Sequence, residues 1–211
     1  MRVEIWSDVA CPWCYIGLVR FERAVEEAGV EVDVVFRAFE LDPSVSTGMS
    51  SPLLTDYLAR KYGDLSRVRA AHGRLAAAGA ELGIDFRWEG MRRANTFDAH
   101  RLLSWALEER GPDHQRALKK ALLRSYFTDG LDVADQAVLG RVANEVGLGA
   151  DEAAAVLSSD RYADHVRAER ETAHQQGIAA VPTFVVDDGW MLQGAHDTDA
   201  WVRALTKISE R

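Results

Sequence analysis

Cys11-Pro12-Trp13-Cys14 contains the only two cysteines of this 211-residue chain. Residues 2–6, just before it, alternate polar and apolar side chains and favour a short β-strand. From Tyr15 onward the apolar side chains recur at helical spacing, and Gly29 is a typical helix end. The two cysteines therefore lie where a strand passes into a helix.

The start of a helix predicts different roles for the two thiols. Unpaired N–H groups and the helix dipole stabilise an anion there, which favours thiolate over thiol. Cys11 lies just before the first turn and gains most, whereas Cys14 lies inside it. Pro12 suits the first helical position because its missing N–H has no intrahelical partner to lose. We therefore expect Cys11 to be the nucleophile and Cys14 to resolve a mixed disulfide.

Three other interpretations of the cysteine pair are weaker. A structural disulfide closing so short a loop removes little entropy from the unfolded chain. A zinc site needs further ligands, which would have to come from scattered histidines. Two unrelated buried thiols would share this spacing by coincidence. The pair is therefore interpreted as redox-active, with no cofactor and no metal ion required.

Length and composition are typical of a globular protein, with 47% hydrophobic and 27% charged residues. The net charge of −8 disfavours nucleic acid and anionic membranes as partners. No apolar run is long enough to cross a membrane, and the first strand begins too close to Met1 to leave room for an export signal. We therefore predict a cytoplasmic protein, in which a lone cysteine pair is more often catalytic or redox-sensing than structural.

A long helical block follows the first helix and a second strand, expected within residues 31–41. From Leu53 to about Gln176 nearly every segment has helical spacing, including one helix capped by Asn95 or Thr96. The block has no glycine-rich phosphate loop and no cluster with metal-ligand spacing. We interpret it as a helical cap without a second chemistry.

The strand pattern returns after Gly177. Residues 182–186 and 190–192 are expected to pair as a hairpin around residues 187–189, and Asp197 or Thr198 to cap a last helix. The order predicts an α/β sheet domain, residues 1–42 and 177–211, that is split by an inserted helical domain, residues 43–176. Pro182, at the start of a strand, gains weight as a signal because the cysteine pair belongs to the same sheet.

Three segments, residues 7–14, 95–102 and 177–184, resemble the thioredoxin superfamily, and within it the DsbA-like group, most closely the FrnE-type oxidoreductases. The resemblance covers essentially the whole chain. It implies a thioredoxin fold with a large all-helical domain inserted between its βαβ and ββα halves. It also implies a cis Pro182 against the cysteines, a Val181 backbone that binds extended substrates, and an apolar rim of Pro12 and Trp13 that tunes the redox potential.

Two departures from related proteins are informative. Thioredoxins and DsbA-like proteins commonly have a buried acid six residues before the first cysteine, which assists proton transfer at the resolving thiol. Ile5 occupies that position here, and Glu4 falls on the other face of the strand, so another base or water must serve Cys14. Kappa-class transferases and 2-hydroxychromene-2-carboxylate isomerases share the fold, but they typically have a serine near Cys11 and no second cysteine.

These observations predict a thiol-disulfide oxidoreductase whose partners are protein or small-molecule thiols and disulfides, with glutathione among the candidates. A glutathione-dependent isomerase or transferase is an alternative, as is a non-catalytic redox sensor or chaperone. His100 is a candidate for the cleft between cap and core, although a buried histidine bonded between helices is commoner. The same applies to His174 and Asn95. The oligomeric state is left open, a homodimer being one option.

Overall fold

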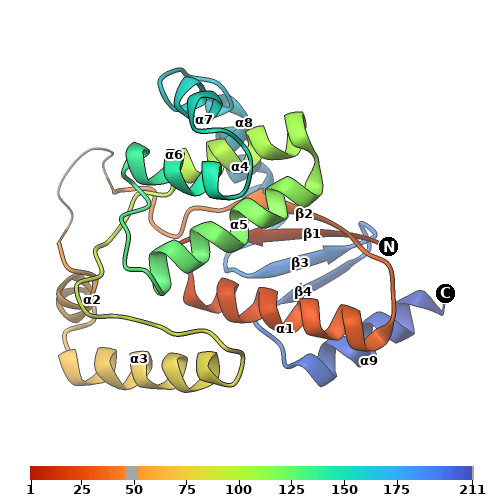
Figure 1. Ribbon diagram of the computed structural model, residues 1–211. Coiled ribbons are helices and arrows are strands. Elements are labelled where there is room, and N and C mark those ends of the chain that lie inside the picture. Colours follow the sequence, from red (N-terminus) through yellow and green to blue (C-terminus); the bar gives the residue numbers. More distant parts are fainter. Residues whose placement is uncertain (46–51, 211) are drawn as a thin grey trace.

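A mixed four-stranded sheet forms the centre of the protein in a computed structural model that describes residues 1–45 and 52–210. The strands are β1 (Arg2–Ser7), β2 (Asp33–Ala38), β3 (Thr183–Val186) and β4 (Trp190–Gln193). Their order is β2-β1-β3-β4, with β1 parallel to β2, antiparallel to β3, and β3 paired with β4 as a hairpin (Figure 1). The sheet therefore brings together the two ends of the chain.

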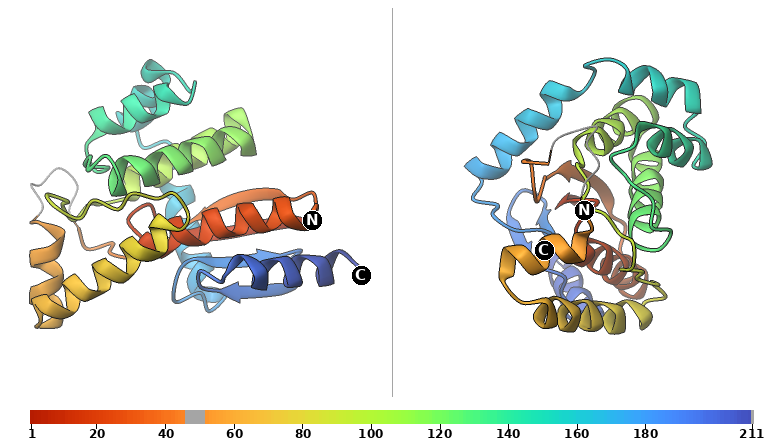
Figure 2. Two further views of the ribbon diagram at one scale, coloured as in Figure 1. Left: turned by 60° about the horizontal axis from the view of Figure 1, so that its bottom comes forward. Right: turned by 90° about the vertical axis from the view of Figure 1, so that its left-hand side faces the viewer.

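Two helices cover one face of the sheet. They are α1 (Pro12–Ala28), which joins β1 to β2, and α9 (Thr198–Ser209), which follows β4 and lies beside α1 (Figure 2). Their apolar sides meet the sheet through aromatic rings. The centroid of the Trp201 ring lies 5.0 Å from that of Phe21 and 4.5 Å from that of Phe184, in edge-on geometry. Such pairs stabilise a core beyond the area that they bury.

Helices of the long middle segment cover the other side of the sheet and its β2 edge. They include α4 (Phe97–Arg110), α5 (Pro112–Phe127) and α8 (Ala163–Gln175). The Gln115 side chain accepts a hydrogen bond from Phe36 N and donates one to Phe36 O, both at 2.9 Å. A carboxylate oxygen of Glu169 accepts from Ala38 N at 2.6 Å. These bonds satisfy backbone groups of β2 that would otherwise lie unpaired at the sheet edge.

The remaining helices extend from this centre. The helices α2 (Leu54–Tyr62) and α3 (Leu65–Ala80) pack on each other, and α3 contacts α1. The helices α6 (Gln136–Glu145) and α7 (Ala150–Leu157) pack together near α4 (Figure 1). The sequence pattern predicts a helical block here but does not separate α7. Buried apolar residues of the sheet and of the middle helices form one continuous core.

Three local predictions differ in detail from the structure. The second strand ends at Ala38 instead of continuing to Leu41, and Leu41 N donates to the carboxylate of Asp8 at 2.7 Å. Thr96 occupies the N-cap position of α4 but makes no capping hydrogen bond with its side chain; Asn95 Oδ1, one residue earlier, accepts from Phe97 N at 2.9 Å. Asp197 occupies the N-cap position of α9 but makes no capping hydrogen bond; it forms an ion pair with Arg20 at 2.9 Å.

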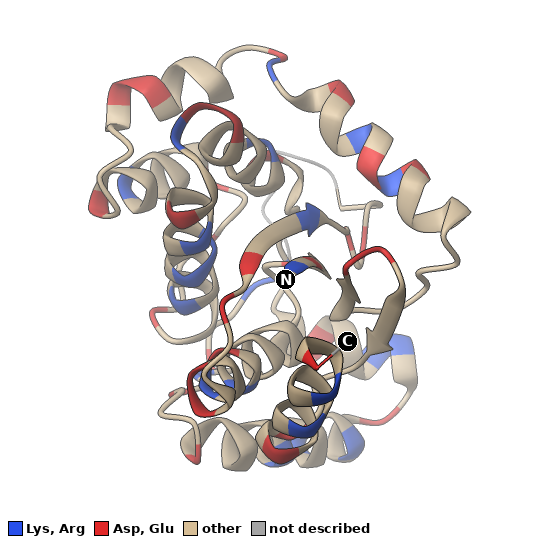
Figure 3. Ribbon diagram, turned by 90° about the vertical axis from the view of Figure 1, so that its right-hand side faces the viewer, with Lys and Arg blue, Asp and Glu red and all other residues tan. Residues whose placement is uncertain are grey.

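Acidic and basic residues are mixed on the face of the molecule shown in Figure 3, for example along α8. In α8 the pairing is direct, since Arg167 lies 2.7 Å from Asp164. Within residues 1–45 and 52–210, no helix combines the length and the apolar character that crossing a membrane requires.

Candidate functional site

Cys11 is the N-cap residue of α1, and Pro12 occupies one of its first helical positions, as the sequence predicts. The backbone of Cys11 is extended (φ −101°, ψ 112°), which turns its side chain back over the first turn. Cys11 Sγ accepts a hydrogen bond from Cys14 N at 3.3 Å. Sulfur therefore takes the place of the oxygen that usually caps a helix, and a thiolate there is favoured by the N–H groups and the dipole.

Cys14 lies one turn further along α1 and is shielded from solvent. The two cysteines are free thiols, with Cys11 4% and Cys14 2% exposed. Burial raises the pKa of the Cys14 thiol well above its ordinary range, the neighbouring Cys11 adds to this effect, and the Lys119 ammonium opposes it. Cys14 is consequently protonated at neutral pH in the reduced protein.

The segment before β3 lies against Cys11. The peptide bond between Val181 and Pro182 is cis, and Cys11 Sγ lies 3.7 Å from the carbonyl oxygen of Val181. Pro182 also contacts α1 closely: a Cβ atom placed on Gly17 would lie only 3.0 Å from Pro182 Cγ. The fold therefore brings the two predicted segments, Cys11–Cys14 and Val181–Pro182, into direct contact.

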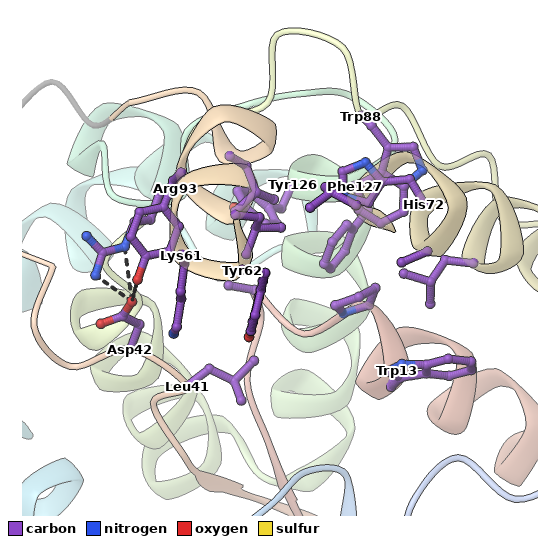
Figure 4. Close-up of a pocket in the computed structure, with 18 of the residues that line it drawn as sticks. Trp13, Leu41, Asp42, Lys61, Tyr62, His72, Trp88, Arg93, Tyr126 and Phe127 are labelled. Atoms are coloured by element: carbon purple, nitrogen blue, oxygen red, sulfur yellow. Dashed lines mark hydrogen bonds and ion pairs between the residues drawn. The ribbon is translucent and has the colours of Figure 1, made fainter. Parts of the chain in front are cut away.

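A pocket of about 700 Å³ opens beside the cysteine motif. Pro12 and Trp13 form one of its walls, and Trp13 is 45% exposed. The opposite walls come from α2, α3 and the segment that follows α3 (Figure 4). There the His72 ring stacks on Trp88 with 4.1 Å between centroids. We call it the aromatic pocket because its lining includes Trp13, Tyr57, Tyr62, His72, Trp88, Tyr126 and Phe127, beside aliphatic and basic side chains such as those of Leu54, Lys61 and Arg67.

The mouth of the pocket is held by an ion pair. Arg93 contacts the carboxylate of Asp42, and Tyr57 donates a hydrogen bond to that carboxylate at 3.0 Å (Figure 4). Burial alone would raise the pKa of Asp42, but hydrogen bonds from Ser44, Arg93 and Tyr57 outweigh burial and lower that pKa to about 2. The carboxylate is therefore charged at any pH near neutrality.

A second group of charged side chains is buried beneath the motif. Asp8 is 1% exposed and accepts from Leu41 N at 2.7 Å and from Ala10 N at 3.3 Å. His100 Nε2 lies 3.4 Å from Asp8 Oδ1, an electrostatic contact without the alignment of a hydrogen bond. Burial raises the pKa of the Asp8 carboxyl, but His100, Leu41 N and Lys119 together hold it below its ordinary value.

The candidate residues of the middle segment take different places. His100 is 2% exposed and faces Asp8 instead of lining the aromatic pocket. Asn95 is buried, accepts from Phe97 N at the start of α4 and donates to the carbonyl oxygen of Val45, so its role is structural. His174 is exposed at the end of α8.

Lys119 is the residue of this site that the sequence analysis missed. It lies on α5, is fully buried, and donates a hydrogen bond from Nζ to the carbonyl oxygen of Ser7 at 3.3 Å. The signal for it was helical spacing, because Gln115, Leu122 and Tyr126 place position 119 on the buried face of α5. A lysine at such a position needs an explanation.

The comparisons with known proteins agree with this geometry. The family model described as DSBA-like thioredoxin domain matches residues 2–206. The crystal structure of a probable DsbA oxidoreductase, SCO1869 from Streptomyces coelicolor, is 39% identical, with a TM-score of 0.90 over 100% of this chain and 91% of that one.

Two more distant structures share the fold. A putative protein disulfide isomerase from Nitrosomonas europaea is 21% identical, with a TM-score of 0.75 over 99% of this chain and 97% of that one. The cytosolic disulfide reductase DsbM from Pseudomonas aeruginosa with GSH is 20% identical, with a TM-score of 0.66 over the full length of both chains. The predicted α/β thioredoxin fold with a helical insertion is thereby confirmed. The chain belongs to the DSBA-like thioredoxin domain family.

Proposed function

We propose that this protein is a thiol-disulfide oxidoreductase that exchanges its Cys11–Cys14 dithiol or disulfide with the cysteines of a substrate. The observation that supports this proposal most strongly is the position of Cys11 Sγ at the N-terminus of α1, 3.7 Å from Val181 O, with Cys14 buried one turn behind it. An attacking thiol, a resolving thiol and an exposed backbone beside them are what this reaction needs. Membership of the DSBA-like family supports the proposal.

The reaction consists of two exchanges. The Cys11 thiolate attacks one sulfur of a substrate disulfide, the substrate S–S bond breaks, and the other sulfur leaves as a thiolate that takes up a proton. Cys14 then attacks Cys11 Sγ in the mixed disulfide and releases the second substrate sulfur as a thiol. The protein pair is oxidised to a disulfide and the substrate is reduced by two electrons. The reverse sequence oxidises a substrate dithiol, and the potential of each partner sets the direction.

The surface around Cys11 suits a substrate that binds in an extended form. The Val181 backbone supplies strand-like hydrogen-bonding groups next to the sulfur, with Pro182 packed against α1. Pro12 and Trp13 form an apolar rim, and the aromatic pocket beside them accommodates apolar groups that flank the substrate sulfur. We include protein and small-molecule thiols among the substrates, and place the reaction in the cytoplasm.

An exchange assay tests this function. Reduced protein is mixed with a peptide that contains one disulfide, and release of the peptide thiol is followed with time. Wild-type protein should reduce the peptide in a burst of one equivalent, and Cys11→Ser should fall to the uncatalysed rate. Equal rates for wild type and Cys11→Ser would overturn the proposal.

A glutathione-dependent isomerase or transferase is the second candidate, and the aromatic pocket is the observation that favours it. A volume of about 700 Å³ next to Pro12 and Trp13 is sufficient for a small aromatic substrate. This candidate requires one sulfur-handling residue only, so it predicts saturable glutathione binding and an activity that survives Cys14→Ser. Thiol-disulfide exchange predicts that multiple turnover is lost in the same variant.

A further inference from the structure

The buried cation of α5, Lys119, has no part in the exchange reaction as described above. Its side chain is fully buried, and its hydrogen-bond partner within the described residues is the carbonyl oxygen of Ser7. Removing an ammonium group from water is costly unless nearby charges or dipoles compensate. The groups that surround Lys119 therefore determine what it does.

Those groups belong to three elements. Asp8, in the segment after β1, and the two thiols of α1, Cys11 and Cys14, are the titratable groups that act on Lys119. The Phe36 ring of β2 lies below the ammonium, with 5.8 Å from Nζ to the ring centroid. The compensation for burial thus comes from the Asp8 carboxylate and the Ser7 carbonyl oxygen, joined by a sulfur of the motif whenever that sulfur is ionised.

The sequence lacks the usual charged neighbour of a resolving thiol. Ile5 is 1% exposed and packs in the apolar core at the position where related proteins carry an acid. Glu4 lies on the other face of β1, where it contacts Arg37 at 2.5 Å. The cation that acts on the Cys14 thiol is consequently supplied from α5, by Lys119.

We propose that Lys119 is a positioning residue for the resolving step, in which its ammonium stabilises the Cys14 sulfur as that sulfur gains negative charge and attacks Cys11 Sγ. This inference rests on the proposed exchange reaction. In the step, the Cys14 Sγ–Cys11 Sγ bond forms, the bond from Cys11 Sγ to the substrate sulfur breaks, and the Cys14 proton passes to the departing substrate thiolate. Lys119 itself keeps its protons.

The electrostatics have the sign that this role requires. Burial and the neighbouring Cys11 raise the pKa of Cys14, and the Lys119 charge lowers it. In return, burial lowers the pKa of Lys119 overall, and Cys14, Asp8 and Cys11 oppose this effect. Removal of the charge should therefore leave Cys14 harder to ionise.

The first test measures Cys14 as the lone thiol, in a Cys11→Ser background. The alkylation rate of Cys14 with iodoacetamide is followed from pH 7 to pH 10 with Lys119 and with Lys119→Met. If Lys119→Met raises the pKa of Cys14 by one unit, the alkylation rate of Cys14 falls about tenfold at each pH below that pKa. Lys120→Met is the matched control, since Lys120 is the next residue of α5 and pairs with Glu22 at the surface. It should leave the rate unchanged.

Lys119→Gln guards against a purely structural effect, because an amide can still donate to Ser7 O while the charge is absent. Both variants should show the tenfold decrease if the charge is responsible. An unchanged pH profile in a folded Lys119→Met or Lys119→Gln protein overturns the proposal.

The second test follows resolution directly. Protein carrying glutathione on Cys11 is prepared in acid and shifted to pH 7, and glutathione release is timed. Lys119→Met should release it about tenfold more slowly than wild type, and equal rates contradict the role of Lys119. If no mixed disulfide forms on wild-type Cys11, the proposed function fails, whereas the alkylation test of Lys119 still gives its answer.

Discussion

On its outer side the cysteine motif presents Trp13, which is 45% exposed, whereas on its inner side it faces Asp8, His100 and Lys119, none more than 2% exposed. The outer side offers apolar rings and backbone groups, which bind extended or aromatic ligands with little dependence on pH. The inner side holds charges in a low-dielectric setting, where each one acts strongly on the thiols. In the proposed reaction, substrate contact and control of protonation are therefore separated across a single turn of helix.

The middle segment contributes to both sides. It supplies His100 and Lys119 of the inner side from α4 and α5, and it forms the pocket walls that face Trp13 on the outer side. The interpretation of that segment as a cap without chemistry is thus incomplete, because it provides a cation to the site and walls to the pocket. The division at residues 43 and 176 stays a prediction about domains.

Asp8→Ala is expected to have the largest effect on stability, because it removes the carboxylate from the buried charges of the inner side. The change leaves Leu41 N and Ala10 N without their acceptor and Lys119 without its carboxylate. Loss of one member of a buried charged group costs about 3 kcal/mol or more in the free energy of unfolding. Urea denaturation of wild type and Asp8→Ala measures this loss in unfolding free energy. Asp164→Ala removes a fully exposed carboxylate and serves as the control, with a change below about 0.5 kcal/mol. A loss below about 1 kcal/mol for Asp8→Ala would mean that the inner charges are not coupled.

Acid should weaken the ion pair at the pocket mouth. The pKa of Asp42 is about 2 in the folded protein against an ordinary 3.8, so its stabilising contribution is present above pH 3.8 and is lost as the pH falls toward 2. The full shift would correspond to about 2 kcal/mol, and solvent screening of this partly exposed pair reduces it. The drop in unfolding free energy between pH 5 and pH 2.5 should be smaller by about 1 kcal/mol in Asp42→Asn than in wild type. Equal drops in the two proteins would show that the pair does not contribute.

Gly17→Ala examines the contact between α1 and Pro182. Alanine in a helix is ordinarily stabilising by about 1 kcal/mol over glycine, but here its Cβ would lie 3.0 Å from Pro182 Cγ. We expect a net loss of about 1 kcal/mol and a several-fold slower exchange, because crowding displaces the Val181 segment from Cys11. Gly140→Ala in α6, where a Cβ meets nothing within 4 Å, should instead gain stability and leave exchange unchanged. An unaltered exchange rate in Gly17→Ala would show that the position of Pro182 does not affect the reaction at Cys11.

Trp13→Ala should have the smallest effect on the fold and should act on the outer side alone. The unfolding free energy is expected to stay within about 0.5 kcal/mol, since nearly half of the side chain is exposed. The KM for a disulfide peptide should rise several-fold, because part of the apolar rim is lost. Trp190→Ala changes an exposed tryptophan of β4 and should leave KM unchanged. A changed kcat with constant KM would contradict a role in binding.

The outer side was largely predictable from the sequence because its signals are local. A strand, the cysteine spacing and helical periodicity place Cys11 at a helix start, and the structure agrees. The inner side depends on which helix packs under the motif, and residue spacing within α5 does not carry that information. Helical spacing did mark position 119 as buried, yet only the folded chain places Lys119 next to Ser7 O. The aromatic pocket likewise depends on how α2 and α3 pack.

The most direct test of the assigned roles is a trapping experiment with Cys14→Ser and Cys11→Ser. Each reduced variant is incubated with a disulfide peptide and with oxidised glutathione, and intact masses are measured after quenching in acid. We predict a stable mixed disulfide on Cys11 of nearly every Cys14→Ser molecule, and almost none on the buried Cys14 of Cys11→Ser. Equal trapping by the two variants, or efficient trapping through Cys14 alone, would contradict it.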